Sequence, residues 1–243
     1  MKFYPADAGA WRRLILWPSL LFAALFLTLE YGGLDLAVSA RFYDPASGSF
    51  PLRNNFWTQA VLHDGARHVL VGLAVGLIAL WALSWRAAWL RPHRRALAYL
   101  IVSITVSLVL VQQLKNHTNV DCPWNITGLG GDRPHVGLFA DRPDALPPGR
   151  CFPGGHSSGG FALLAFYFVG RGPRRVWLLA PGLVIGSVFA FDQWMRGAHF
   201  PSHDLASAYV SWMTALAVAR VFDAISAARK NAARRCEASD SAA

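Results

Sequence analysis

"ALAYLIVSITVSLVLVQQL", residues 96–114, contains no charged side chain and is followed directly by Lys115. A helix needs roughly 17–25 mainly apolar residues to cross the hydrocarbon core of a bilayer, so this stretch predicts a membrane-spanning helix. Further apolar runs lie along the chain at residues 14–29, 69–85, 161–169, 176–191 and 205–222. We therefore expect an all-α, polytopic membrane protein with six transmembrane helices, of which residues 161–169 form the shortest.

The composition agrees with a membrane protein. Hydrophobic residues make up 54% of the chain, the mean hydropathy is +0.31, and only 15% of the residues are charged, whereas an ordinary soluble domain carries about 25%. The net charge of +9 comes from short basic clusters between the apolar runs, not from the basic stripe of a nucleic-acid-binding face. We expect the lipid bilayer as a partner and no nucleic acid. Nothing in the sequence indicates an oligomeric state.

The basic clusters also predict the orientation. They lie before the first run, between the second and third, between the fourth and fifth, and after the sixth, at residues 12–13, 86–95, 171–175 and 229–235. Cytoplasmic loops are enriched in Lys and Arg. We therefore expect both termini in the cytoplasm of a bacterium and the chain in its inner membrane. Residues 1–229 are expected to form one membrane domain, and residues 230–243 a disordered polar tail.

Three polar clusters lie on the other, extracytoplasmic side: "KNHTNVDCPWN" (115–125), "CFPGGHSSGG" (151–160) and "DQWMRGAHFPSHD" (192–204). Ionisable residues at the ends of membrane helices are candidates for a functional site. Cations and backbone N–H groups at a helix start can bind an anion. Two histidines can supply the nucleophile and the general acid of a phosphoryl transfer. This chemistry needs no metal ion or other cofactor. The residues that offer these groups are Lys115, Arg196, Gly154, Gly155, Ser157, His156, His199 and His203.

The clusters resemble, in order and on the same side of the membrane, the motifs of the type 2 phosphatidic acid phosphatase superfamily. That family carries Lys, six residues and Arg-Pro; then Pro-Ser-Gly-His; then Ser-Arg, five residues, His, three residues and Asp. Here Lys115 precedes Cys122-Pro123 by six residues, His156 ends Pro-Gly-Gly-His, and His199 lies in the third motif, with motif region 115–204. The resemblance implies a lipid phosphate or diphosphate phosphohydrolase, with its active site at the extracytoplasmic ends of helices three to six.

Four positions depart from the family pattern. Cys122 replaces the first arginine, and Arg133 or Arg142 from the same loop are the candidates to replace it. Gly154 replaces the serine, which leaves backbone groups and the Ser157 or Ser158 hydroxyl there. Gln193 stands in place of the second arginine, and Arg196 follows one helical turn later. His203, with Asp204 beside it, stands where the family has its aspartate.

The resemblance assigns roles to these residues. His199 attacks phosphorus and forms a phosphohistidine, while His156 protonates the leaving oxygen. Lys115, Arg196 and the Gly154–Gly155 amides hold the phosphate, and His203 with Asp204 orients His199. An alternative alignment makes His203 the nucleophile. Two other functions stay open: a lipid-to-lipid phosphotransferase of the same superfamily, and a non-catalytic anionic-lipid binder or transporter with a degraded site. The sequence does not identify the lipid substrate.

The remaining histidines and the cysteines carry weaker signals. A single histidine at a helix end is more often a cap or an interfacial hydrogen bonder, and we place His63, His68, His93, His117 and His135 in that class. Cys122 and Cys151 fall in one extracytoplasmic loop, where an oxidising compartment permits a disulfide. We state that disulfide as a hypothesis, because the sequence cannot establish its geometry.

Overall fold

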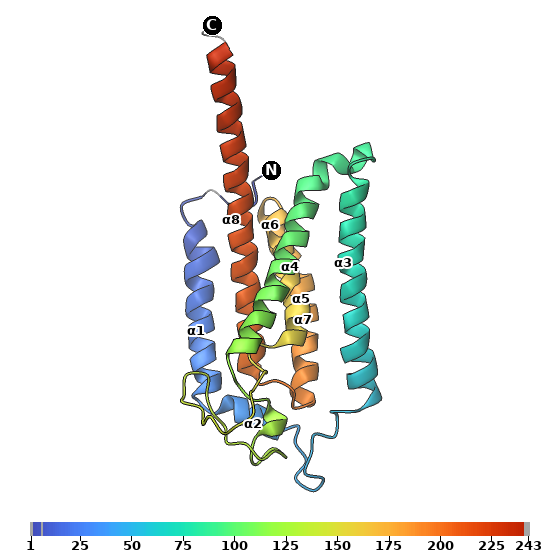
Figure 1. Cartoon of the computed structure of the whole chain (residues 1–243), viewed down its shortest axis with the longest axis vertical. Helices are drawn as coiled ribbons and strands as arrows, with labels where there is room; N and C mark the ends of the chain where they lie inside the picture. The colour runs from blue at the N-terminus through green and yellow to red at the C-terminus, as the bar shows by residue number, and fades with distance from the viewer. Residues whose placement is uncertain (1, 6, 241–243) are drawn as a thin grey trace.

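The computed structural model describes residues 2–5 and 7–240, and Figure 1 shows the arrangement of its helices. The α-helices are α1 (Trp17–Glu30), α2 (Leu34–Ala40), α3 (Ala66–Leu83), α4 (Arg94–His117), α5 (Gly155–Phe161), α6 (Phe166–Val169), α7 (Ala180–Met195) and α8 (Pro201–Asp240). Short π-helical and 3₁₀ stretches precede or join them, at Arg12–Leu16, Trp57–Gly65, Ala88–His93, Pro123–Asn125, Ala162–Ala165 and Pro173–Leu179. All the secondary-structure elements of the described residues are helices.

Five of these segments are long and apolar enough to cross a membrane: Arg12–Glu30, Trp57–Leu83, Ala88–His117, Pro173–Met195 and Pro201–Glu237. Four of them contain a whole apolar run named above, and Trp57–Leu83 contains the run at 69–85 except for its last two residues. Several extend beyond the run, because a neighbouring helical stretch continues in the same direction. The protein is therefore a multi-pass membrane protein.

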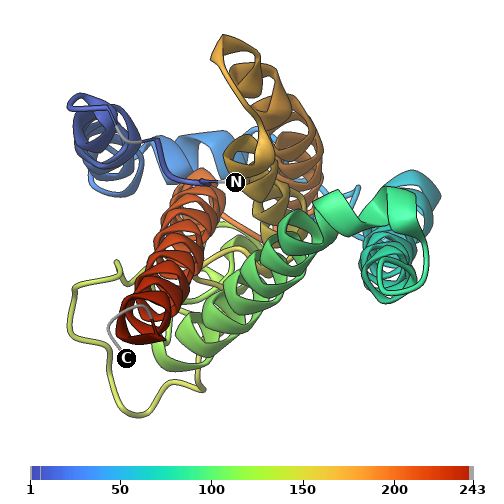
Figure 2. The same cartoon turned by 90° about the horizontal axis from the view of Figure 1, so that it is seen from above.

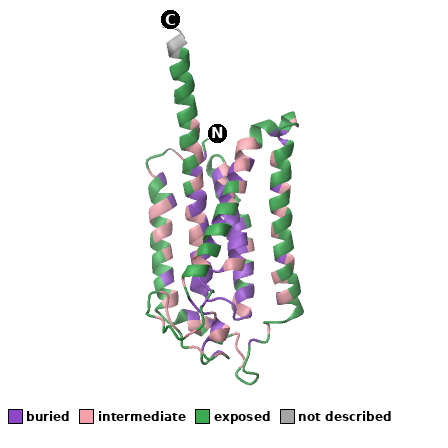
Figure 3. Ribbon diagram, in the orientation of Figure 1, coloured by how far each residue is buried: buried purple, intermediate pink, exposed green. Residues whose placement is uncertain are grey.

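The apolar run at residues 161–169 lies outside those five spans. It belongs to a broken helix made of α5, the 3₁₀ stretch Ala162–Ala165 and α6, which is nearly all buried (Figure 3). Glycines let α5 pack directly against α7. A Cβ atom on Gly160 would lie 2.4 Å from the backbone nitrogen of Gly186, and one on Gly186 would lie 2.3 Å from the Phe161 ring. The two backbones therefore touch, with no side chain between them.

α8 is the central helix of the bundle, with α1 and α4 on either side (Figures 1 and 2). Buried hydrogen bonds join it to α4, from the Tyr99 hydroxyl to the Ala215 carbonyl at 3.0 Å and between the Ser107 and Ser211 hydroxyls at 2.9 Å. Both chain termini lie at one end of the bundle, and α2 with the long loop lies at the other (Figure 1). We call the latter the site end.

The tail differs from the expectation of disorder. Residues 230–240 continue α8 as regular helix, and residues 241–243 lie outside the described residues. Alanine, arginine, lysine and glutamate, which are common in this segment, are strong helix formers. Because α8 is already fixed by the bundle, it needs no new nucleation to extend.

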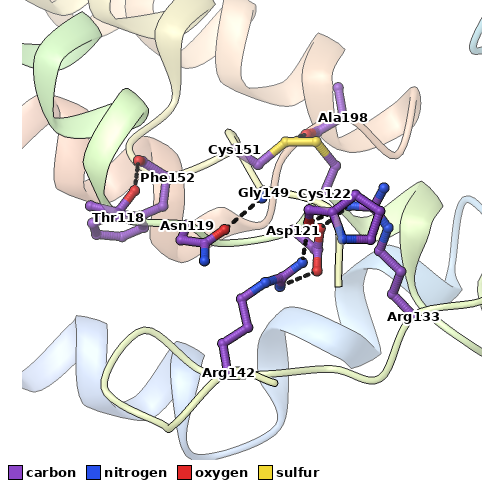
Figure 4. Close-up of a disulfide and its surroundings, with 11 residues drawn as sticks. Thr118, Asn119, Asp121, Cys122, Arg133, Arg142, Gly149, Cys151, Phe152 and Ala198 are labelled. Atoms are coloured by element: carbon purple, nitrogen blue, oxygen red, sulfur yellow. Dashed lines mark hydrogen bonds and ion pairs between the residues drawn. A yellow bond between two sulfur atoms is a disulfide. The ribbon is translucent and has the colours of Figure 1, made fainter. Parts of the chain in front are cut away.

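The loop between α4 and α5 is cross-linked at the site end. The hypothesised disulfide joins Cys122 and Cys151, whose Cα atoms lie 5.2 Å apart. Figure 4 shows the polar contacts that order the loop beside it, including the Asn119 side chain that accepts a 2.7 Å hydrogen bond from the Gly149 N–H. The Cys151 sulfur lies 3.4 Å from the carbonyl oxygen of Ala198, which fixes the loop against the connection between α7 and α8.

Candidate active site

Four parts of the chain meet at the site end. The last turn of α4 brings Lys115, the start of α5 brings His156, the connection after α7 brings His199, and the first turn of α8 brings His203 and Asp204. Lys115 lies against α5, because a Cβ atom on Gly155 would lie 3.1 Å from its Nζ atom. The three sequence clusters, which are far apart along the chain, therefore form one site.

His199 and His203 are almost completely buried, with exposed fractions of 4% and 1%. Their rings meet edge to face with centroids 5.9 Å apart, and the structure records no hydrogen bond between them. Nδ1 of each ring has no hydrogen-bond partner among the described residues. Burial lowers the pKa of His199 well below its usual range, and Lys115 and His203 add to this effect. The His199 imidazole is therefore neutral, which is the form that a nucleophile requires.

Asp204 lies against α5 and the end of α7, and the structure records no hydrogen bond from it to His199. Its carboxylate accepts hydrogen bonds from the Ser157 hydroxyl at 2.5 Å and from the Trp194 indole N–H at 2.7 Å. Asp204 thus joins the start of α5 to the end of α7. The Ser157 hydroxyl, which the sequence offered as a phosphate ligand, is already used in this contact.

Gly154 explains one departure from the family pattern. A Cβ atom at position 154 would lie only 2.0 Å from Oδ1 of Asp204, so the family serine does not fit beside an aspartate at position 204. The glycine at position 154 and the shift of the aspartate by one residue, to position 204, are therefore linked: the second requires the first. The Gly154 N–H donates to the His203 carbonyl at 2.9 Å and is not available to a phosphate, contrary to the expectation from sequence. Gly155 remains beside Lys115.

His156 contacts two rings. The His63 ring is stacked on it, with centroids 4.3 Å apart and planes inclined by 25°, and the Phe189 ring lies at 5.1 Å, tilted by 48°. Its Nε2 atom lies 3.5 Å from the Leu62 carbonyl oxygen. The sequence predicted His63 to be a helix cap or an interfacial hydrogen bonder, since no motif surrounds it. The sequence feature that could have indicated a role in the site was its position at the site end of the second span.

Arg196 is buried and turned toward the segment that leads into α3. Its Nε donates to the Arg53 carbonyl at 3.1 Å, Nη2 donates to the Gln59 side chain, and Nη1 lies 3.8 Å from Oδ2 of Asp192. Nη1 has no hydrogen-bond partner among the described residues, and neither has Oδ1 of Asp192. Buried polar atoms are normally paired with protein or water.

Arg133 and Arg142 do not replace the missing arginine. Both guanidinium groups contact the buried carboxylate of Asp121, that of Arg133 at 2.6 Å, and both donate to the Pro147 carbonyl (Figure 4). Their charges therefore neutralise Asp121 and order the loop. Cys122 itself is in the disulfide, so no cation takes the place of the family arginine at that position.

A carboxyl pair that the sequence analysis missed holds the start of α8. Oδ1 of Asp35 accepts a hydrogen bond from the Ser202 N–H at 3.0 Å, and Oε2 of Glu30 accepts one from the Ser202 hydroxyl at 3.2 Å. Burial raises the pKa of Asp35 to about 6, against the opposing effect of Ser202. Asp35 acts as an N-cap from a distant element, which no local sequence pattern reveals.

A cavity of about 310 Å³ opens beside His156, between α3, α4 and α5. Its polar end is formed by Gly155, His156 and three residues of the segment that begins α3, namely His63, Asp64 and Arg67. Its apolar end is lined by Leu70, Val71, Ala74, Leu108 and Gly159. A molecule with a charged head and an apolar tail matches this lining. The described residues contain no group of three or more His, Cys, Asp or Glu side chains that could hold a metal ion.

Comparison with known proteins gives one positive result. No curated protein and no solved structure matches the chain. The family model of the PAP2 superfamily matches residues 96–226, which is more than half of the chain and includes every residue of the three motifs. From this match we conclude that the chain belongs to the PAP2 superfamily, the type 2 phosphatidic acid phosphatases.

Proposed function

We propose that this protein is a lipid phosphate phosphohydrolase that works through a phosphohistidine on His199. Membership of the superfamily supports the coarser statement, a phosphoric ester hydrolase. The observation that carries the specific proposal is the meeting of Lys115, His156 and His199 at one end of the bundle. Since His199 is neutral and Lys115 supplies positive charge, the site combines a nucleophile with an anion-binding group.

The proposed reaction has two steps. A ring nitrogen of His199 attacks phosphorus, the bond from phosphorus to the lipid oxygen breaks, and His156 gives a proton to that oxygen. His156 then takes a proton from water as the water oxygen attacks phosphorus. The phosphorus–nitrogen bond breaks, which releases inorganic phosphate and restores both histidines. Lys115 and the Gly155 backbone stabilise the charge on the phosphoryl oxygens.

The structure supports changed roles for three residues of the third motif. We assign Asp204 to positioning, because it fixes Ser157 and Trp194 and so holds the start of α5 against α7. His203 packs against His199 and supplies its carbonyl to Gly154. Arg196 lies close enough to act electrostatically on His156, and we propose that it attracts the phosphate toward that residue.

The substrate is proposed to be a lipid because the cavity beside His156 continues between membrane-spanning helices. Its apolar lining lies along α3 and α4, within the predicted hydrocarbon region. A headgroup phosphate at the polar end would leave the hydrocarbon chain between these helices. Lysolipids, diacyl lipids and polyprenyl diphosphates all have this amphipathic form, and the cavity does not select among them.

We propose that the site faces the outside of a bacterial inner membrane. Both termini and the basic clusters lie at the opposite end of the bundle from the site, and clusters of this kind mark the cytoplasmic side. The disulfide at the site end fits an oxidising compartment. In this arrangement the broken helix that contains α5 and α6 is the sixth span. It crosses the membrane buried among the other helices.

The proposal is tested by phosphate release from lipid phosphates and diphosphates in detergent, with chelator present. His199→Ala and His156→Ala should abolish release, and His68→Ala, an exposed histidine on α3, is the matched control. Loss of activity in His203→Ala but not in His199→Ala would transfer the nucleophile to His203. Phosphate that appears on a second lipid, with little free phosphate, would make the protein a phosphotransferase. No turnover of any lipid phosphate, with binding intact, would leave a binding protein and refute the proposal.

A further inference from the structure

The stacked pair of His63 and His156 is not explained by the family motifs. His156 lies in the second motif, whereas His63 comes from the Trp57–Gly65 stretch that leads into α3. The rings are stacked with centroids 4.3 Å apart, and Phe189 contacts His156 at 5.1 Å. The imidazole of His156 thus has aromatic contacts from two other elements.

His63 is itself fixed from α7. Nε2 of Gln193 lies 3.5 Å from Nδ1 of His63, and the same amide nitrogen donates to Oδ2 of Asp192 at 2.7 Å. An amide N–H directed at Nδ1 favours an acceptor there, which in the neutral ring of His63 corresponds to the tautomer with its proton on Nε2. Gln193 stands where the family pattern has an arginine. In this chain Gln193, at that position, contacts His63.

The charges around the pair come from several elements. Lys115 on α4 and Arg196 after α7 act electrostatically on both rings, and Asp64 and Arg67 lie on the same helix as His63. Positive charge on both of two imidazoles 4.3 Å apart, with two cations nearby, is strongly disfavoured. The pair therefore carries at most one positive charge.

We propose that His63 is a positioning residue for the general acid–base catalyst: it holds the His156 imidazole by stacking and limits the pair to one positive charge. This inference rests on the proposed function, in which His156 protonates the leaving oxygen. His63 would then act through His156, without touching the reacting phosphorus. Its two effects, stacking and charge repulsion, are separable by substitution.

Two variants separate these effects. His63→Phe keeps a stacked ring but cannot bind a proton, whereas His63→Ala removes both. We expect His63→Ala to lower kcat at least tenfold with KM changed less than threefold. We expect His63→Phe to keep most of the activity, with the alkaline limb of kcat/KM moved up by about one pH unit, since the repulsion that opposes the His156 proton is gone. His68→Phe, on the exposed side of the same helix, should match the wild type in both respects.

One further measurement distinguishes the possible failures. An NMR titration of the His156 ring, without substrate, should show its midpoint at higher pH in His63→Phe than in the wild type, whether or not the protein turns over lipid. An unchanged midpoint and pH profile in His63→Phe would overturn the inference. No turnover by the wild type would instead refute the proposed function, while the titration would still decide whether the rings are coupled.

Discussion

The packing of Gly154 against Asp204 allows a quantitative prediction. In Gly154→Ala the new methyl group would lie 2.0 Å from Oδ1 of Asp204 and 2.9 Å from Oγ of Ser157. The backbone angles at Gly154, φ −63° and ψ 113°, suit any residue, so the effect is steric only. The backbone cannot move away, because its N–H donates to the His203 carbonyl and its carbonyl accepts from the Ser207 hydroxyl at 2.6 Å.

The expected loss of stability follows from the hydrogen bonds that Asp204 must break. Moving the carboxylate aside breaks its hydrogen bonds to Ser157 and Trp194, and hydrogen bonds to a charged group contribute about 1.5–3 kcal/mol each. Partial relaxation keeps some of this energy, and overpacking of a dense site by itself costs about 1–3 kcal/mol. We therefore expect Gly154→Ala to lower the free energy of unfolding by about 2–4 kcal/mol. For a chain of this size this lowers Tm by roughly 5–15 °C.

The assay is thermal unfolding in detergent at a fixed scan rate, with a double-mutant cycle. Asp204→Ala removes the closest clashing atoms and leaves only the 2.9 Å approach to Oγ of Ser157, so Gly154→Ala should add much less destabilisation in that background. Gly72→Ala is the matched control, because a methyl group there meets nothing within 4 Å. A Tm for Gly154→Ala equal to that of wild type, or equal effects of Gly154→Ala in both backgrounds, would refute the argument.

Three more predictions follow from the site. Replacing Cys122 and Cys151 by serine, or reducing the disulfide, should lower the free energy of unfolding by up to about 4 kcal/mol for a loop of this size; equal Tm values with and without reductant would contradict this. Because the pKa of Asp35 is raised to about 6, the folded state binds a proton that the unfolded state releases, so stability should fall by roughly 2–2.5 kcal/mol as pH rises from 4 to 7. Asp35→Asn should show less of that fall in thermal unfolding, and an identical pH dependence would exclude Asp35. Since the pKa of His199 is lowered, kcat/KM should not fall between pH 7 and pH 5.5, whereas a tenfold loss would show that the nucleophile is protonated there.

The elements that hydropathy alone can reveal were predicted well. Each of the five long spans coincides with an expected apolar run, and the multi-pass membrane fold is confirmed. Residues 161–169 were expected as the shortest of six spans, and they belong to a broken helix inside the bundle. Hydropathy cannot distinguish a helix that contacts lipid from one that contacts protein. The glycines at 160 and 186 were the available sign of a close helix crossing.

The site was predicted in outline, and its details depend on tertiary contacts. Motif spacing brought together Lys115, His156 and His199, and the structure places them at one end of the bundle. Spacing could not show that Asp204 would contact Ser157 and Trp194, because that pairing depends on how α8 begins. Glu30, Asp35 and His63 were missed because each acts across a distance in sequence and lies in no motif.

The glycine crossing of α5 and α7 bears on where the proposed lipid substrate would enter. The two helices touch backbone to backbone at Gly160 and Gly186, so they cannot slide or separate without losing that packing. α3 is different: it stands at the edge of the bundle (Figure 2) and forms one wall of the cavity beside His156. On the proposed function, a lipid that entered this cavity from the membrane would displace α3 more easily than α5. That displacement would also carry His63 away from His156, so the acid–base pair would be complete only once α3 had closed behind the substrate.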